Sequence, residues 1–254
     1  TALVTGVLTA NGGAVFNEAG VDVDFRVESD TVDHALFVDG ATGKIGIGIV
    51  PISKLHIKVS DNAYTGGIQI EDTDSTTKSA ITHVNGGLYI SSNATNDHIG
   101  IDATGAVTMP LQPAFHVNKG GTDVSNIAAD GSYSLITWNT ARFDQNADFD
   151  LTNNRFVAPV TGKYNLQVQI RLENVDSAAG YYILKLATSN EDYICLFDPD
   201  FGQDATYWGM TINVLADMDA SDTVNVSIIQ SSGTQQTDID GDAHYTFFSG
   251  YLVA

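Results

Sequence analysis

The run WNTARFDQNADFDLTNNRFVAPVTGKYNLQV, residues 138–168, contains the strongest fold signal in the chain. Near its end, from Tyr164 onward, every second residue is apolar, and this alternation continues to Leu172. A period of two puts alternate side chains on opposite faces of a strand, so the segment predicts a half-buried β-strand. Gly162, two residues earlier, favours a tight turn at low steric cost. We therefore expect a long strand that begins directly after a turn.

Within this run, aromatic and acidic residues stand at set spacings. They are Trp138, Asp144, Phe149, Phe156, Gly162 and Tyr164. The pattern resembles the signature of the complement component 1q and tumour-necrosis-factor-like family, in which two aromatics, an Asn or Asp, a Phe and a Gly-x-Tyr hold these places. The departures keep the positions apolar: Trp138 replaces a usual Phe, and Leu166 and Val168 replace common aromatics. The resemblance covers residues 113–254 and implies a jelly-roll head.

Strand-like segments continue to the C-terminus, each bounded by turn-type residues. They are Tyr181–Leu186, Tyr193–Phe197, Tyr207–Leu215, Thr223–Ile229 and His244–Val253. Regular strands of this kind predict an all-β sandwich or jelly roll. The last strand is apolar on both faces, although a sandwich strand needs only one buried face. We therefore predict a threefold subunit interface that includes Phe115, Tyr245, Phe247 and Tyr251; packing within the core of one chain is the alternative.

Residues 1–112 contain only very short strands, before the head domain at 113–254. The clearest are Val21–Val27, Ala35–Val38, Lys44–Ile49 and Lys54–Val59. Asp39–Ile45 is echoed by Asp102–Val107, as in a stacked repeat. Because such short strands cannot close a core within one chain, we predict that copies bury their apolar faces against one another in an elongated trimeric shaft. A small independent β-domain is the alternative.

Three stretches of this region form a further pattern, in which Pro51 and Lys54-Leu55-His56 follow a glycine-rich strand. The stretches are Asn17–Asp30, His34–Asp39 and Gly43–Gly48. Together they resemble a segment of fibre and appendage proteins of tailed bacteriophages, notably those of marine cyanobacteria. Ile49 and Val50 depart from the small polar residues usual there. The resemblance covers residues 16–58 and implies a virion structural protein in an external appendage, with its N-terminal region attached to other virion proteins.

The chain carries 31 acidic and 11 basic residues, a formal net charge of −20 at pH 7. Such a charge repels phosphate backbones and anionic lipid heads, so we expect no nucleic-acid partner. No apolar stretch reaches the roughly 20 residues of a membrane span and no signal peptide opens the sequence, so membrane insertion is not expected. The single cysteine, Cys195, excludes an intrachain disulfide and is expected to be a small buried thiol.

The sequence indicates a non-enzymatic protein. It contains no evident nucleophile with its base and no convincing carboxylate pair, and its six histidines are scattered without zinc-ligand spacing. One acidic turn, Asp238, Asp240 and Asp242 around Gly241, offers hard oxygen ligands to Ca²⁺, although it lacks the downstream Glu of an EF-hand loop. A solvated acidic turn is the alternative. Asp198–Asp204 is a weaker site of the same kind.

Three loops are expected to gather near the ends of the jelly roll, where binding functions concentrate. They are Glu173–Gly180, Asp198–Thr206 and Ser231–Ala243. The resulting hypothesis is a homotrimeric fibre of a tailed bacteriophage whose head adheres to a glycan or protein of the host surface, helped by avidity. The alternatives are a head or neck decoration fibre that stabilises the particle, a secreted trimeric ligand or lectin-like module, and a glycan-cleaving tailspike.

Overall fold

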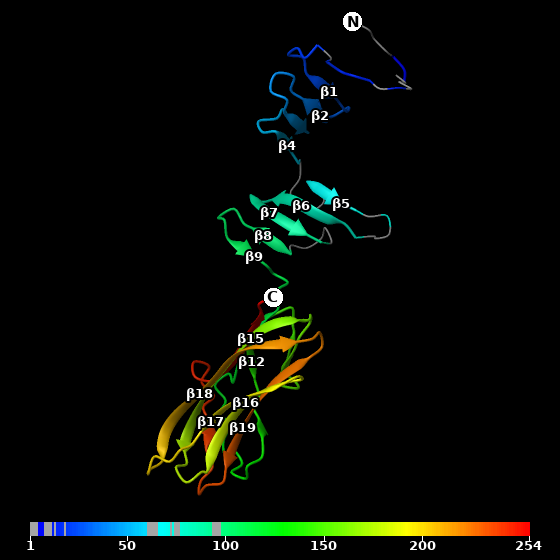
Figure 1. The fold of residues 1–254 in the computed structure, drawn as a ribbon. Helices are drawn as coiled ribbons and strands as arrows, with labels where there is room; N and C mark the ends of the chain where they lie inside the picture. The colour runs from blue at the N-terminus through cyan, green and yellow to red at the C-terminus, as the bar shows by residue number, and fades with distance from the viewer. Residues whose placement is uncertain are drawn as a thin grey trace. The chain divides into compact units, whose positions relative to one another are not determined.

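The computed structural model of the chain describes residues 5–7, 12, 14–17, 19–59, 66–71, 73, 77–92 and 98–254. Glu18, in the stretch Asn17–Asp30, lies outside the described residues. The chain divides into two compact units, Thr1–Met109 and Pro110–Ala254 (Figure 1), whereas the sequence placed the division after residue 112. The described residues are all-β, as predicted, and include no helix that could cross a membrane.

The N-terminal unit contains two small sheets made of short strands. The first has the order β1 (Phe25–Val27), β2 (Leu36–Val38), β3 (Ile45–Ile47), β4 (Leu55–Ile57). The second has the order β5 (Ile68–Ile70), β6 (Ser79–Val84), β7 (Gly87–Ser91), β8 (Ile99–Ile101), β9 (Val107–Thr108). All neighbouring strands are antiparallel except β3 and β4.

The sequence echo between Asp39 and Asp102 has a structural counterpart, because both residues organise a tight turn. The Oδ1 atom of Asp39 accepts a hydrogen bond from the amide of Ala41 at 2.9 Å, and that of Asp102 accepts one from the amide of Thr104 at 2.8 Å. Each turn then uses a left-handed glycine, Gly43 with φ 62° and Gly105 with φ 90°. Hydrogen bonds from nearby threonine hydroxyls lower the pKa of both aspartates. Side-chain capping and a glycine together reverse the chain.

The head unit consists of two sheets that enclose one core. The first sheet has the order β12 (Thr140–Gln145), β10 (Ala114–Asn118), β21 (Phe247–Leu252), β15 (Gly162–Val175), β18 (Ala205–Met218), with β20 (Asp238–Ile239) beside β15. The second has the order β13 (Phe149–Asp150), β14 (Arg155–Val157), β19 (Thr223–Ser231), β16 (Tyr181–Thr188), β17 (Asp192–Phe197), with β11 (Ser134–Leu135) beside β19. This arrangement confirms the predicted jelly-roll sandwich.

The predicted alternation in β15 is confirmed by burial. The five apolar side chains of the predicted alternation are fully enclosed, namely Tyr164, Leu166, Val168, Ile170 and Leu172. They pack with residues of the opposite sheet such as Leu184 and Val226. Cys195, expected to be buried, is half-buried beside this core. The core is thus complete within one copy of the chain.

Gly162 is required for a close approach of backbone rather than for a left-handed turn. It begins β15, and its φ is not positive. A Cβ atom at this position would lie 2.5 Å from the carbonyl oxygen of Ala254, which accepts a hydrogen bond from the amide of Lys163 at 2.7 Å. The C-terminus of the chain therefore needs a glycine there, a reason that local turn patterns do not reveal.

Phe115 corrects one sequence-based expectation, because its side chain belongs to the core of a single head and not to a subunit interface. It is 1% exposed and lies opposite Gly250 in β21. Its ring stacks on Phe156 at 4.6 Å and meets the edge of Phe248 at 4.9 Å. The residue that points outward from the same strand is its neighbour His116, as alternation requires.

Candidate functional site

The outer face of the β12-β10-β21-β15-β18 sheet is aromatic and accessible. We call it the outer face and define it by Phe143, Tyr207, Tyr245, Phe247 and Tyr251. Tyr207 and Tyr251 are both more than half exposed, and Phe143 is 52% exposed. Three of these residues, Tyr245, Phe247 and Tyr251, were predicted from the sequence to meet another subunit. Exposed aromatic rings are the side chains most enriched at protein interfaces.

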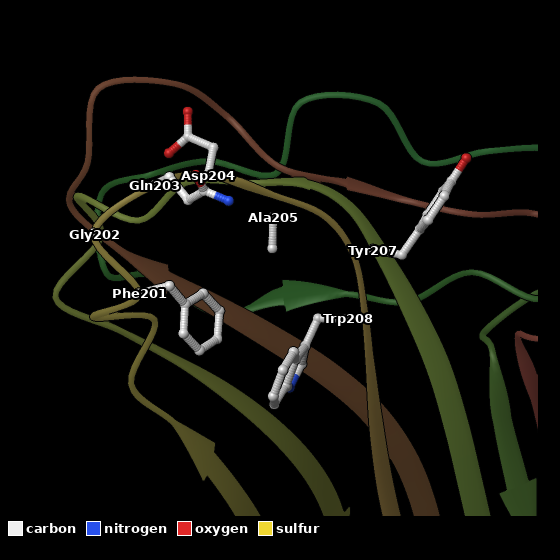
Figure 2. A pocket seen from close by; sticks show the side chains of 7 residues that line it. All are labelled: Phe201, Gly202, Gln203, Asp204, Ala205, Tyr207 and Trp208. Atoms are coloured by element: carbon white, nitrogen blue, oxygen red, sulfur yellow. The ribbon is translucent and has the colours of Figure 1, made fainter.

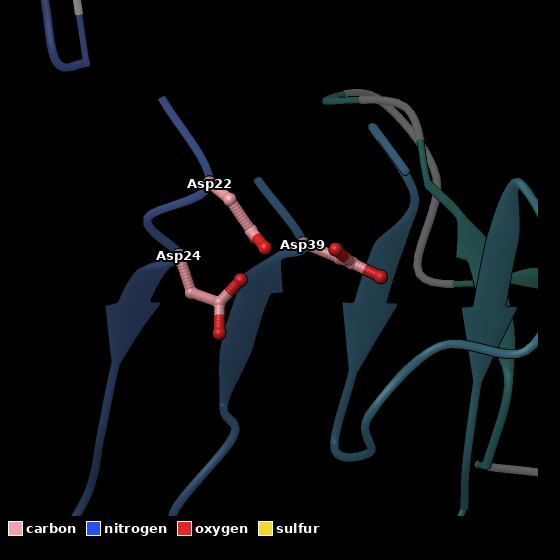
Figure 3. A group of neighbouring side chains, drawn as sticks. All are labelled: Asp22, Asp24 and Asp39. Atoms are coloured by element: carbon pink, nitrogen blue, oxygen red, sulfur yellow. The ribbon is translucent and has the colours of Figure 1, made fainter. Parts of the chain in front are cut away.

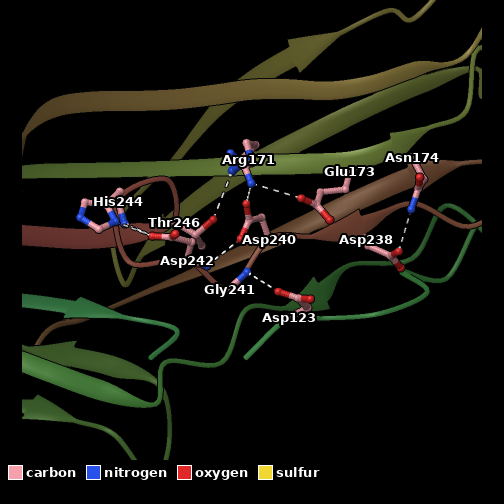
Figure 4. A network of polar contacts seen from close by, with 10 residues as sticks. All are labelled: Asp123, Arg171, Glu173, Asn174, Asp238, Asp240, Gly241, Asp242, His244 and Thr246. Carbon is pink, nitrogen blue, oxygen red and sulfur yellow. Dashed lines mark hydrogen bonds and ion pairs between the residues drawn. The ribbon is translucent and has the colours of Figure 1, made fainter. Parts of the chain in front are cut away.

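Arg171 lies among these rings. Its guanidinium carbon is 3.6 Å from the ring centroid of Tyr245 and 4.7 Å from that of Tyr207, so it makes cation–π contacts on two sides. It also forms ion pairs with Asp240 and, at 3.2 Å, with Glu173 (Figure 4). These contacts fix the position of the Arg171 guanidinium on the outer face. The Nε atom of Arg171 is buried and has no hydrogen-bond partner among the described residues.

The three carboxylates predicted to bind Ca²⁺ point to different partners. Asp240 is 5% exposed and pairs with Arg171, which already neutralises its charge. Asp242 accepts a hydrogen bond from the amide of His244 at 2.8 Å and contacts the Nδ1 atom of the same residue at 2.6 Å; the amide first, and then the ring, lower the pKa of Asp242. Asp238 accepts a hydrogen bond from the amide of Asn126 at 2.7 Å. The three aspartates therefore mainly hold the surrounding loop in place (Figure 4), and calcium binding by them stays a prediction.

A different acidic group is brought together in the N-terminal unit. Asp22, Asp24 and Asp39 each offer a carboxylate oxygen within 4.8 Å of the others (Figure 3). The pairing of Phe25 with Val38 in neighbouring strands places them there. Asp22 and Asp24 form an Asp-x-Asp pair in the sequence, whereas Asp39 joins them only through the sheet. One oxygen of Asp24 is occupied by the amide of Gly40 at 2.9 Å.

The three loops predicted to gather at an end of the head do converge, and Asp176 ties two of them together. It is fully buried, and its carboxylate accepts hydrogen bonds from the amides of Ala178 and Gln235, both at 2.8 Å, and from the amide of Thr234. Burial raises the pKa of Asp176, but these hydrogen bonds outweigh it and hold the pKa below its usual value.

Asp204 brings in the third loop. Its Oδ1 atom accepts hydrogen bonds from the amide and the hydroxyl of Ser177, at 2.9 and 2.8 Å. The joined loops, which we call the tip, lie at the end of the sandwich away from the C-terminus (Figure 1). The tip was expected from strand order, but Asp176 was not singled out because nothing in its sequence context marks it as buried.

A cavity of about 400 Å³ opens at the tip (Figure 2). It is lined by Phe201, Gly202, Gln203, Asp204, Ala205, Tyr207 and Trp208. The Trp208 ring stacks on Phe197 at 4.5 Å and tilts against Phe201 at 5.2 Å, while Gln203 and Asp204 supply polar groups. Such a combination of flat apolar rings and polar groups is typical of small ligand sites.

Comparison with known proteins bears on the head only. A family model described as "C1q domain" matches residues 121–253. The globular domain of the zebrafish complement 1qA protein is 18% identical with a TM-score of 0.40, covering 56% of this chain and 98% of that chain. Murine APRIL, crystallised at pH 8.0, is 12% identical with a TM-score of 0.40, covering 56% and 99%. No curated protein sequence matches this chain.

Proposed function

This chain belongs to the C1q domain family, and from that premise we propose that it is a homotrimeric, non-enzymatic fibre protein of a tailed bacteriophage. In this proposal the N-terminal unit forms the shaft, and the head presents its tip to the surface of the host cell. C1q domains are generally binding modules rather than enzymes, which supports the non-enzymatic part.

The main support for the proposed homotrimer is the exposure of aromatic side chains on the outer face of the head. Its three tyrosines and Phe143 remain exposed and Phe247 is half-buried, although the core of the same sandwich is closed; Tyr251 alone is 53% exposed. An exposed aromatic face of this kind favours association with another protein surface. Because Arg171 is already paired with Asp240 and Glu173, this face carries no unpaired guanidinium that would oppose contact with another copy.

The phage context rests on the resemblance of residues 16–58 to tailed-phage fibre segments. The adhesive role rests on the tip, because three loops meet there at the end of the domain opposite to its C-terminus. Three tips on one fibre, and several fibres on one particle, raise effective affinity by about 10² to 10⁴ without stronger single contacts. Location on the tail, the neck or the capsid is open in this proposal, and a decoration fibre is its variant.

Two measurements test the proposal. Light scattering of the full chain is expected to give three times the 27.0 kDa chain mass. Tyr251→Glu, on the outer face, is expected to shift the protein to smaller species, whereas Leu135→Glu, an exposed position on the opposite sheet, is expected to leave the mass unchanged. Gold-labelled antibody should then mark an external appendage of phage particles. A stable single subunit at neutral pH and moderate salt would overturn the trimer.

The tip cavity favours a second candidate, a trimeric ligand or lectin-like module. The rings of Trp208 and Phe201, tilted against each other, present flat apolar surfaces beside the polar Gln203, which is the kind of surface a sugar ring covers. The two candidates differ in location, because a phage fibre is found on purified particles and a secreted module is not. Antibody labelling that leaves particles bare while glycan arrays bind Trp208-dependently would favour the second candidate.

A further inference from the structure

The second sheet of the N-terminal unit has one face made almost entirely of aliphatic side chains. Its register aligns four isoleucines directly across four strands: Ile68 pairs with Ile81, Ile81 with Ile90, and Ile90 with Ile99. A parallel row continues with Leu88, Ile101 and Val107. We call this surface the aliphatic face. Directly opposed side chains on one face contact each other, so these residues form a continuous apolar strip.

The aliphatic face is open in a single copy. Ile68, Ile81, Ile90 and Ile99 are all 41–45% exposed. The opposite face has the reverse properties, since its small or polar residues Ala80, Thr82 and Ser91 are at most 3% exposed. The polarity of this sheet is therefore opposite to that of a sheet in a monomeric protein, where the apolar side is the covered one.

The chain itself covers the opposite face. The ring of Tyr89 lies across Gly87 and Gly100, where an added Cβ atom would come within 2.8 Å of it. Those two glycines are therefore required for the ring to lie flat on the sheet. Because one side of the sheet is closed by its own residues, a covering partner is needed only on the aliphatic face.

The first sheet repeats the arrangement independently. Phe25 pairs with Val38, Val38 with Ile45, and Ile45 with Leu55, so four apolar side chains again share one face. Ile45 and Leu55 are 40% and 55% exposed. On the other face, a Cβ atom at Gly46 would meet the carbonyl oxygen of Ile49 at 2.0 Å, so the chain closes that side here as well. Two sheets with the same one-sided exposure indicate a shared purpose.

We infer that two further copies of this same chain cover these faces, so that three sheets close around an axis with the aliphatic faces inward. The inference rests on the proposed homotrimer. Among the described strands β5 to β9, His83, opposite Leu88, is the one titratable side chain on the aliphatic face. Because this face carries no Asp, Glu, Lys or Arg in these strands, the surface that covers it is expected to be uncharged and apolar. Each copy of the chain carries one such apolar surface, so three copies provide three identical aliphatic faces that can cover one another.

Trimeric heads would also hold three N-terminal units close together, which makes their association intramolecular. An acidic chain of net charge −20 does not otherwise favour self-association, so contact has to occur through its uncharged surfaces. The aliphatic face meets that requirement, and the small and polar residues Ala80, Thr82 and Ser91 of the opposite face are already covered by the chain itself.

Thiol labelling of the full chain tests the inference. In a Cys195→Ser background, Ile90→Cys reports on the aliphatic face, and Thr108→Cys, which is exposed on the opposite face, is the matched control. We expect an uncharged maleimide to label Ile90→Cys at least about tenfold more slowly than Thr108→Cys, and both equally in denaturant. Ile45→Cys should show the same protection in the first sheet.

Light scattering on the same samples separates the possible failures. Fast labelling of Ile90→Cys in a protein of trimeric mass would overturn the covered face while leaving the trimeric head intact. A monomeric mass with fast labelling at both positions would overturn the proposed function as well. Slow labelling of Ile90→Cys in a monomer would mean that the chain covers its own face, which also contradicts the inference.

Discussion

The head and the N-terminal unit use the same aliphatic residues in opposite ways. In the head, Leu166 and Ile170 are fully buried because a second sheet lies over them. In the N-terminal unit, the side chains of Ile81 and Ile90 lie on an open face of a sheet and are 41% and 45% exposed. The head therefore completes its core within one copy, whereas the N-terminal unit covers one side of each sheet and leaves the other side exposed.

Strand length is the physical origin of this difference. Strands of 14 residues, such as β15 and β18, present enough apolar side chains on one face to bury a second sheet. Strands of three residues, such as β3 and β8, place two isoleucines on that face and a glycine on the other. Two isoleucines per strand cannot offset the cost of ordering a second layer from the same chain.

The largest effect that sharpens this comparison is expected from Phe115→Ala. The ring is enclosed by Phe156 and Phe248, so its removal should cost about 3–5 kcal/mol of unfolding free energy. Guanidinium denaturation of the full chain measures it. Ile90→Ala is the contrasting change, since it should alter the association of copies more than the unfolding of the head. A Phe115→Ala protein of unchanged stability but altered mass would restore Phe115 to the subunit interface.

The next effect concerns the charge on the outer face. Asp240 is buried against Arg171, so Asp240→Ala should cost about 3 kcal/mol by leaving the guanidinium without its main counter-charge. Replacing both residues, with Arg171→Met and Asp240→Ala, should restore most of the loss. A double-mutant cycle on unfolding free energies measures the coupling. Additive single effects would show that the ion pair does not organise this face.

A smaller effect is expected at the tip from Asp176→Asn, about 1–2 kcal/mol, because an amide replaces a carboxylate that accepts several backbone hydrogen bonds. The pKa of Asp176 is lower in the folded protein than its unfolded value of 3.8. Its stabilisation is thus present above that pH and is lost as pH falls through the folded pKa.

Acid denaturation of the wild type and of Asp176→Asn measures this contribution, and the variant should lack it. Gly233→Ala is a second change at the same place, because the added Cβ atom would lie 2.3 Å from Asp176 and φ there is +121°. Loops that keep their protection from hydrogen exchange in both variants would show that Asp176 does not join them.

The smallest effect is a pH dependence from His116, which stacks on Phe247 at 5.2 Å on the outer face. Burial, and to a lesser degree Arg142, lowers its pKa below 6.5 in the folded state. The unfolded chain therefore binds the proton first, so stability is complete above pH 6.5 and falls as pH drops toward the folded pKa. Thermal unfolding of wild type and His116→Gln between about pH 7.5 and 5 measures the difference. Parallel curves would contradict it.

Much of the head could be predicted from local patterns. The alternation from Tyr164 to Leu172 indicates which residues are buried, because a strand has only two faces. The positions of Asp238, Asp240 and Asp242 could not be interpreted in the same way. Their spacing suggests a shared ligand, but Asp240 forms an ion pair with Arg171, which is far away in the sequence and lies on the neighbouring strand β15. Long-range partners of this kind leave no trace in short windows of sequence.

Local sequence patterns were enough to predict an all-β chain, its organisation in two parts and the residues that share one face of each strand, because these depend on periodicity and turn chemistry over a few residues. The folded structure was needed to show that Phe115 points into the core and that the loops at the tip meet at Asp176. It also decided which face of each N-terminal sheet the chain covers. Those outcomes depend on register between segments far apart in sequence, and register is set by packing across the whole domain.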